Sequence, residues 1–78
     1  MPWEADRTPG FSIVRIQREI LEQKGIRYGW KYGGGTIEIE ILSKDRSIAE
    51  EVAADMKAQD IETTIEETPN GLLIKRRT

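Results

Sequence analysis

The sequence contains no cysteine and no histidine. Without cysteine, neither a disulfide framework nor a thiolate metal site can form, and the composition fits a reducing compartment. Without histidine, the chain lacks the usual general base, the commonest metal ligand and the side chain that titrates near neutral pH. A zinc site would need a shell made only of carboxylates. We therefore expect no metal, no cofactor and no enzymatic activity.

The chain also lacks a marked charge excess and a long apolar run. Its 12 basic and 14 acidic residues leave a formal charge of -2, which gives no global attraction for nucleic acid or anionic membranes. No apolar stretch approaches the roughly 18 residues of a transmembrane helix. Residues 1–10 lack the basic start and apolar centre of a signal peptide. We expect a soluble, cytoplasmic protein that makes no membrane contact.

The length of 78 residues allows one small domain with room for a single sheet and two helices. Residues 1–8 show no periodicity and predict a flexible N-terminal arm. The single domain is therefore expected to span residues 9–78.

The first helix is predicted from an apolar periodicity over residues 11–24. Thr8 as N-cap and Pro9 at the first helical position would begin it. Its buried stripe is expected to hold three isoleucines at helical spacing, widened on one side by a valine and a leucine: Ile13, Ile16, Ile20, Val14 and Leu21. Gly25 is expected to end the helix in the left-handed conformation.

Residues 26–42 show the clearest strand pattern in the chain. Alternating side chains flank three consecutive glycines at positions 33–35, which predicts a hairpin with a flexible turn. In the second strand, isoleucines are expected to face the core and glutamates the solvent: Ile37, Ile39 and Ile41, with Glu38 and Glu40 between them. A phosphate-binding loop is disfavoured because the glycines join two strands rather than a strand and a helix.

The second half of the chain repeats this organisation. A helix is predicted over residues 43–59, with Ser43 as a candidate N-cap and with Ser47 and Glu50 at capping-box spacing. Its buried stripe is expected to contain Ile48, Val52 and Met56. Strands over residues 61–68 and 72–77 then form a second hairpin around residues 69–71, in which Asn-Gly is a strong turn dipeptide.

The order of elements predicts an α+β fold, α-β-β-α-β-β, in which two helices cover one face of a four-stranded antiparallel sheet. The two halves superpose without a gap at an offset of 35 residues, which indicates either an internal αββ duplication, with repeats 9–42 and 44–77, or two similar units of independent origin. A two-fold relation would place the first strand beside the third, or the second beside the fourth.

The solvent face of this sheet is the first candidate binding surface. It is expected to carry the basic residues of the first and last strands: Arg27, Lys31, Lys75, Arg76 and Arg77. Glutamates of the other two strands interleave with them, so cross-strand ion pairs explain these charges without any ligand. As a functional surface, the basic residues would bind an acidic protein partner or single-stranded nucleic acid.

Three aromatic residues, Tyr28, Trp30 and Tyr32, share one face of the first strand. We assign them to the core because the chain has few other large apolar side chains, and large aromatics dominate small cores. If they pointed outward, they would form a base-stacking platform beside Arg27 and Lys31.

Other features suggest contacts with a partner. Trp3 on the N-terminal arm is expected either to pack over the open sheet, which is the preferred interpretation, or to be an anchor for a partner, of the kind that dominates protein interfaces. The two edge strands could pair with a second copy or with an extended peptide. Glu38 and Glu40 would suit a carboxylate-dependent enzyme, but the sequence shows no third ligand and little volume for a pocket.

These observations favour a small non-catalytic binding or regulatory module that acts through contacts with a protein partner or with itself. The alternative is nucleic-acid binding on the open sheet face, through the basic and aromatic residues of the first and last strands.

Overall fold

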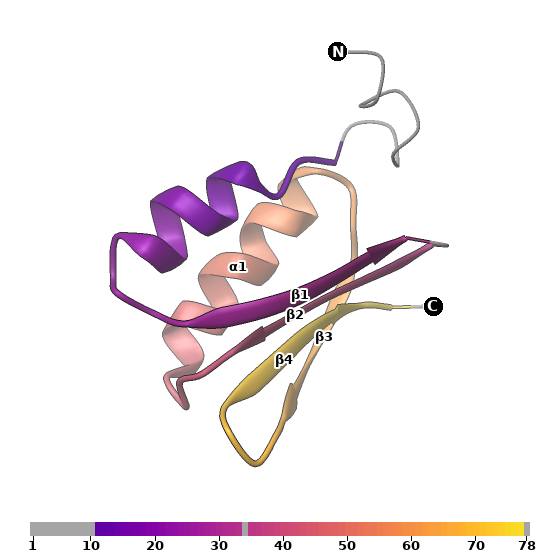
Figure 1. Cartoon of the computed structure of the whole chain (residues 1–78). Coiled ribbons are helices and arrows are strands. Elements are labelled where there is room, and N and C mark those ends of the chain that lie inside the picture. Colours follow the sequence, from indigo (N-terminus) through magenta and orange to yellow (C-terminus); the bar gives the residue numbers. More distant parts are fainter. Residues whose placement is uncertain (1–10, 34, 78) are drawn as a thin grey trace.

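The computed structural model describes residues 11–33 and 35–77. They form a four-stranded antiparallel sheet with two helices on one face (Figure 1), so the predicted α+β fold is confirmed. In chain order the elements are η2 (Ile16–Glu22), β1 (Tyr28–Gly33), β2 (Thr36–Ile41), α1 (Arg46–Ala58), β3 (Thr63–Glu67) and β4 (Leu72–Arg76). The predicted arm with Trp3, and the predicted helix start at Thr8 and Pro9, lie outside the described residues.

The first helix differs from the prediction because η2 is a π-helix, preceded by α-helical residues 14–15. In a π-helix the hydrogen bonds join residues five apart, which brings Ile16 and Leu21 onto the same face, and both are fully buried. In an α-helix the same residues would lie about 140° apart around the axis. The predicted stripe is therefore wrong in part, since Ile20 is only half-buried and Val14 is 51% exposed.

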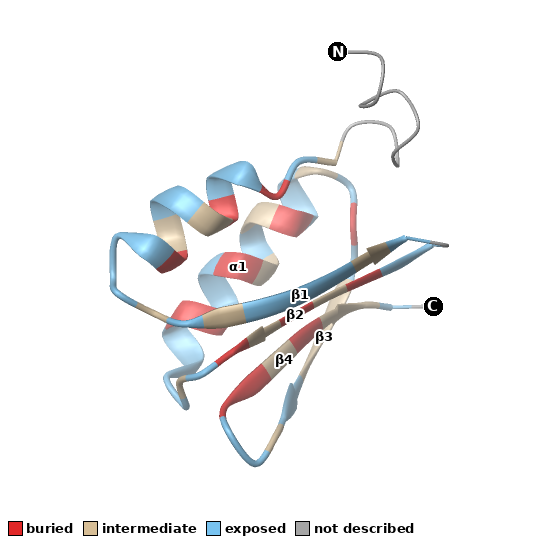
Figure 2. Cartoon of the chain, viewed as in Figure 1, coloured by how far each residue is buried: buried red, intermediate tan, exposed pale blue. Residues whose placement is uncertain are grey.

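The hydrophobic core lies between the sheet and the two helices (Figure 2). The isoleucines predicted to face inward from the second strand are all buried, as are the three predicted core residues of α1. Among the described residues, the buried apolar side chains are Ile13, Ile16, Leu21, Ile37, Ile39, Ile41, Ile48, Ala49, Val52, Met56, Ile61, Leu72 and Ile74.

The strand order is β1-β2-β4-β3, so β2 and β4 are central and β1 and β3 are edges. This is one of the two predicted two-fold arrangements. Ile39 of β2 lies opposite Ile74 of β4, and these two residues are equivalent at the 35-residue offset. The pairing of the central strands is therefore symmetric about this one pair.

Both helices also end in the same way. Gly25 and Asp60, which are equivalent at the same offset, both take left-handed backbone conformations with φ of 69° and 67°. The Ile26 amide donates to the Leu21 carbonyl at 2.9 Å. At the equivalent positions, the Ile61 amide donates to the Met56 carbonyl, also at 2.9 Å. These matches support two copies of one αββ unit, while the duplication itself stays a prediction.

Asp60→Gly is expected to raise the free energy of unfolding by about 0.5–1 kcal/mol, because glycine relieves the steric cost of a left-handed conformation. Gly25→Asp is the matched reverse substitution and is expected to destabilise the protein. Urea denaturation followed by circular dichroism measures both. A destabilised Asp60→Gly variant would contradict the expectation.

The N-cap of α1 is Asp45 rather than the predicted Ser43. The Oδ1 atom of Asp45 accepts hydrogen bonds from the Ser47 amide at 3.0 Å and from the Ser47 hydroxyl at 2.7 Å. Ser43 accepts from the Asp45 amide at 3.1 Å and so shapes the approach to the helix. The predicted capping box between Ser47 and Glu50 does not form, because Ser47 already lies inside α1.

The hydrogen bonds from Ser47 lower the pKa of the Asp45 carboxyl. A carboxyl whose pKa is lower in the folded state stabilises the fold above its unfolded pKa and loses that contribution as the pH falls. Asn caps helices without titrating in this range. We therefore expect the stability difference between wild type and Asp45→Asn to shrink below about pH 4. Parallel urea titrations across pH 2–7 test this, and a constant difference would contradict it.

The second hairpin uses its glycine differently from the prediction. Thr68 and Gly71 bond to each other through their backbones, so residues 69–70 are the central pair of the turn and Asn-Gly is not. A Cβ atom at Gly71 would overlap the carbonyl oxygen of Ile41 and lie 2.7 Å from the amide nitrogen of Ser43. Gly71 therefore permits close contact with the chain that leads from β2 to α1.

Candidate functional site

The open face of the sheet, opposite the helices, brings together four of the five predicted basic residues. Strand register places Lys31 opposite Glu38, and Glu38 opposite Lys75. Arg27 and Arg77 extend the same face at the ends of β1 and β4. Arg76 is not part of this face, because it shares the side of Ile74.

Arg76 instead contacts the first hairpin. It lies opposite Thr63 on the helix-covered side of the sheet. Its guanidinium donates to the carbonyl of Gly35 at 3.3 Å. The side chain therefore links β4 to the β1–β2 turn.

The charges of the open face divide into a paired half and an unpaired half. Lys75 of β4 lies 3.4 Å from Glu66 of β3, and Arg77, directly after β4, lies 3.7 Å from Glu62, directly before β3. This bears out the predicted cross-strand pairing for these strands. Among residues 11–33 and 35–77, Arg27 and Lys31 make no ion pair. Of these two cations, Lys31 lies on edge strand β1 and Arg27 lies directly before it.

A shallow hollow of about 290 Å³ lies over the open face. Gly29, which has no side chain, and Leu73 form part of its floor, and Glu38 and Glu40 line it as well. Within the described part of the chain, no three acidic side chains gather in a group suited to a metal ion. No third acidic ligand for Glu38 and Glu40 is therefore present among residues 11–33 and 35–77.

The aromatic residues of β1 lie on the helix-covered side. Register places each opposite a buried isoleucine of β2: Tyr28 with Ile41, Trp30 with Ile39, and Tyr32 with Ile37. The predicted face is therefore right, and these rings form no stacking platform on the open face. Their burial is incomplete, because β1 is an edge and is largely exposed along its length (Figure 2). Trp30 is 38% exposed.

The partly exposed rings form a cluster beside the first helix. Tyr32 stacks on Phe11 with a centroid distance of 5.8 Å and contacts Trp30 at 5.9 Å. The Tyr28 hydroxyl donates to Glu22 at 2.9 Å. Burial, followed by this hydrogen bond, raises the pKa of Tyr28. The hydroxyl of Tyr28 thus joins β1 to η2, and Tyr32 joins β1 to the segment before the helix, while Trp30 lies at the margin of the cluster.

In each edge strand the backbone N–H and C=O groups point toward the neighbouring strand and away from the sheet at alternate residues. The Leu42 amide donates to the Arg27 carbonyl at 2.9 Å, so odd-numbered residues of β1 bond to β2. The N–H and C=O groups of Tyr28 and Trp30 consequently point out of the sheet. The Arg77 amide donates to the Glu62 carbonyl at 2.8 Å, so the odd-numbered residues of β3 point outward in the same way.

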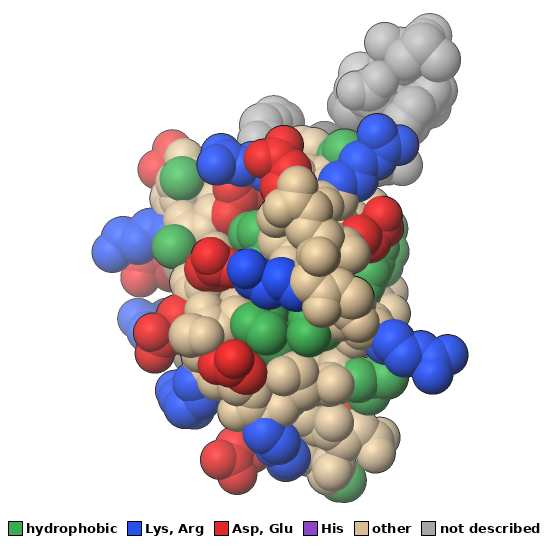
Figure 3. Space-filling view, turned by 90° about the vertical axis from the view of Figure 1, so that its left-hand side faces the viewer, with side chains coloured by type: hydrophobic (Ala, Val, Ile, Leu, Met, Phe, Trp, Pro, Cys, Tyr) green, Lys and Arg blue, Asp and Glu red, His purple; other side chains and the backbone are tan. Residues whose placement is uncertain are grey.

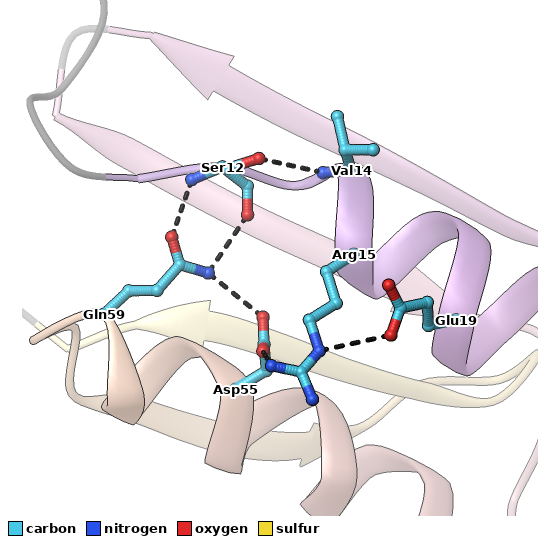
Figure 4. A network of polar contacts seen from close by, with 6 residues as sticks. All are labelled: Ser12, Val14, Arg15, Glu19, Asp55 and Gln59. Carbon is cyan, nitrogen blue, oxygen red and sulfur yellow. Dashed lines mark hydrogen bonds and ion pairs between the residues drawn. The ribbon is translucent and has the colours of Figure 1, made fainter.

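A polar network that the sequence did not reveal ties the first helical segment to α1 (Figure 4). The side-chain amide of Gln59 bonds to both backbone groups of Ser12, at 2.7 and 3.0 Å, and also donates to Asp55 at 3.0 Å. Arg15 bridges Asp55 at 3.7 Å and Glu19 at 3.5 Å. The adjoining groove of about 390 Å³ is walled by these paired charges, which indicates a structural role.

The side of the molecule drawn in Figure 3 shows basic and acidic side chains interspersed around small apolar areas. No patch of one sign covers it. Charge therefore gives no separate binding surface on this side.

Comparisons with known protein families, with curated proteins and with solved structures find no match. In the described ranges, no helix is long and apolar enough to cross a membrane. Support for a functional site therefore comes from the sequence and the structure of this chain alone. The sequence shows both the aromatic residues of the first strand and the two cations beside them. That this strand lies at an edge of the sheet follows only from the strand order.

Proposed function

We propose that the chain is a small non-catalytic protein-binding module whose contact surface is the free edge of β1. The observation that carries this proposal is Trp30, a large apolar side chain exposed on a strand whose outer backbone groups are unpaired by the sheet. Strand addition uses such backbone groups for affinity and neighbouring side chains for specificity. Exposed tryptophan is also the residue type most enriched at energetically important interface positions.

The charges on β1 support the same surface. Arg27 and Lys31 are exposed on the open side of the strand and have no acidic partner among the described residues. A strand added beside β1 would place its own alternate side chains next to them. The edge therefore combines an exposed apolar side chain, the outward-pointing backbone groups of Tyr28 and Trp30, and two cations.

Nucleic-acid binding, the alternative, gains less support. Glu38 and Glu40 lie on the same face as the basic residues and would repel phosphate. Lys75 is already close to Glu66, and the aromatic rings point to the opposite side of the sheet. No stacking surface accompanies the cations.

Trp30→Ser is expected to weaken binding of a protein partner by about 30-fold, the effect of removing an interface anchor of about 2 kcal/mol. Val14→Ser is the matched control, since Val14 is 51% exposed on the first helix and away from the edge. Tagged wild type and both variants are used for affinity capture from the native host, with bound proteins quantified by mass spectrometry. Equal capture by wild type and Trp30→Ser would contradict the proposal.

A further inference from the structure

We propose that the free edge of β1 pairs with the free edge of β3 from a second copy of this chain, in antiparallel orientation. The sheet would then continue from one molecule into the next. This inference rests on the proposed function, because it names the occupant of the same contact surface.

The two edges carry opposite charges at equivalent positions. Under the 35-residue offset that relates the halves, Arg27 of the first edge corresponds to Glu62 of the second, and Lys31 corresponds to Glu66. One edge is therefore basic and the other acidic on the same open face. Cations on an edge discourage pairing with a similar edge, but they favour an acidic one.

Backbone geometry restricts the register of such a pairing. The backbone N–H and C=O groups that point out of the sheet belong to even-numbered residues on β1 and to odd-numbered residues on β3. Hydrogen bonds between the two antiparallel edges must therefore join an even-numbered residue of β1 to an odd-numbered residue of β3. The register centred on Gly29 places this residue opposite Thr64 of the second copy. Trp30 then pairs with Thr63 of the second copy, and Tyr28 pairs with its Ile65.

In this register both cations meet carboxylates. Arg27 lies opposite Glu66 of the second copy, and Lys31 lies opposite its Glu62. Each carboxylate would then sit between two cations, since Glu66 already lies 3.4 Å from Lys75 within its own chain. The two neighbouring registers permitted by the backbone place Arg27 opposite threonine instead, at position 64 or 68.

Pairing of two β1 edges lacks this complementarity. A register centred on Gly29 places Arg27 opposite Lys31 of the second copy, and one centred on Lys31 places that cation opposite itself. A register centred on Trp30 places both cations opposite glycines. None of these registers brings opposite charges together, so the head-to-tail arrangement is the favoured one.

The helix layer is compatible with a continuous sheet. Four strands at about 4.8 Å spacing span about 19 Å. Two packed helices at about 8–10 Å spacing span nearly the same width. Each copy therefore adds a strip of sheet and a strip of helices of matching breadth. Because the two surfaces differ, the contact is heterologous and leads to rings or open chains of molecules.

A disulfide experiment tests the register, since the natural chain has no cysteine. Gly29→Cys meets no atom within 4 Å of its added Cβ, and Thr64→Cys lies on the same open face. Positions 29 and 64 would form a non-hydrogen-bonded cross-strand pair, whose close Cα atoms suit a disulfide. The two single variants are mixed at equal concentration and low salt, oxidised, and analysed by mass spectrometry.

The expected result is a mixed disulfide between positions 29 and 64 that exceeds either homodisulfide about tenfold, and an excess that falls as salt rises. Random collision would give only the statistical mixture. A statistical mixture, or a dominant disulfide between two copies of position 29, would overturn the inference. In that case the capture experiment with Trp30→Ser would still decide the proposed function separately.

Charge reversal gives an independent measurement. Sedimentation velocity at low salt is expected to show concentration-dependent association of the wild type. Arg27→Glu/Lys31→Glu is expected to abolish it, and so is Glu62→Lys/Glu66→Lys, whereas an equimolar mixture of both variants should associate again. Circular dichroism first verifies that each variant is folded. A wild type that stays monomeric, or association that survives Arg27→Glu/Lys31→Glu, would overturn the inference.

Discussion

Leu21→Ala is expected to lower the free energy of unfolding by about 2–5 kcal/mol, the range for large-to-small substitutions in a core. Ile20→Ala is expected to lower it by only about 1 kcal/mol, because a half-buried side chain loses less apolar contact. The difference arises from the π-helix, which turns Leu21 rather than Ile20 fully into the core. Urea denaturation followed by far-ultraviolet circular dichroism measures both values.

Val14→Ala serves as the control for this pair, because Val14 is 51% exposed and its truncation should change stability little. An α-helix with the stripe predicted from sequence would place Ile20 closer to the centre of the buried arc than Leu21. If Ile20→Ala proved as costly as Leu21→Ala, the π-helical geometry of η2 would be contradicted.

Gly71→Ala is expected to destabilise the fold by about 3 kcal/mol or more, above the usual cost of overpacking, because the added methyl group meets backbone atoms. The carbonyl of Ile41 and the amide of Ser43 belong to the chain between β2 and α1 and cannot move aside by changing a rotamer. A loss of this size is a large fraction of the stability of a small domain. Thermal unfolding and urea denaturation both report it.

Gly29→Ala is the matched control, since nothing lies within 4 Å of its added Cβ and its backbone is not left-handed. It should be neutral or slightly stabilising, because alanine restricts the unfolded chain more than glycine does. Similar losses for the two variants would show that close backbone contact at Gly71 is not the reason for its glycine.

The two-fold relation between the halves connects the fold with the proposed contacts. Ile39 faces Ile74 across the central strands, and the helix ends at Gly25 and Asp60 share one conformation. Such a relation also makes β1 and β3 equivalent edges. Their opposite charges are the main difference between the edges on the open face, and this difference is what gives the sheet two complementary sides.

The sequence by itself determined the features that depend on short-range patterns. Alternation of Ile37, Ile39 and Ile41 with glutamates fixed both the strand and its buried face, because side chains on a strand point to opposite sides in turn. Gly25 takes the predicted left-handed conformation in the turn that follows η2, since glycine adopts it at little cost. The shared face of Tyr28 and Trp30 followed from the same period of two.

The tertiary structure decided the features that depend on neighbours distant in the chain. Strand order made β1 an edge, which left Trp30 partly exposed although it lies on the predicted face. The π-helical turn made Leu21, predicted at the side of the stripe, fully buried and left Ile20 half-buried, and a pattern counted at 100° per residue contains no sign of this. Gly71 owes its identity to backbone atoms about 30 residues earlier in the chain. Local periodicity reports which face a side chain takes, whereas burial and contact depend on which element the fold brings to that face.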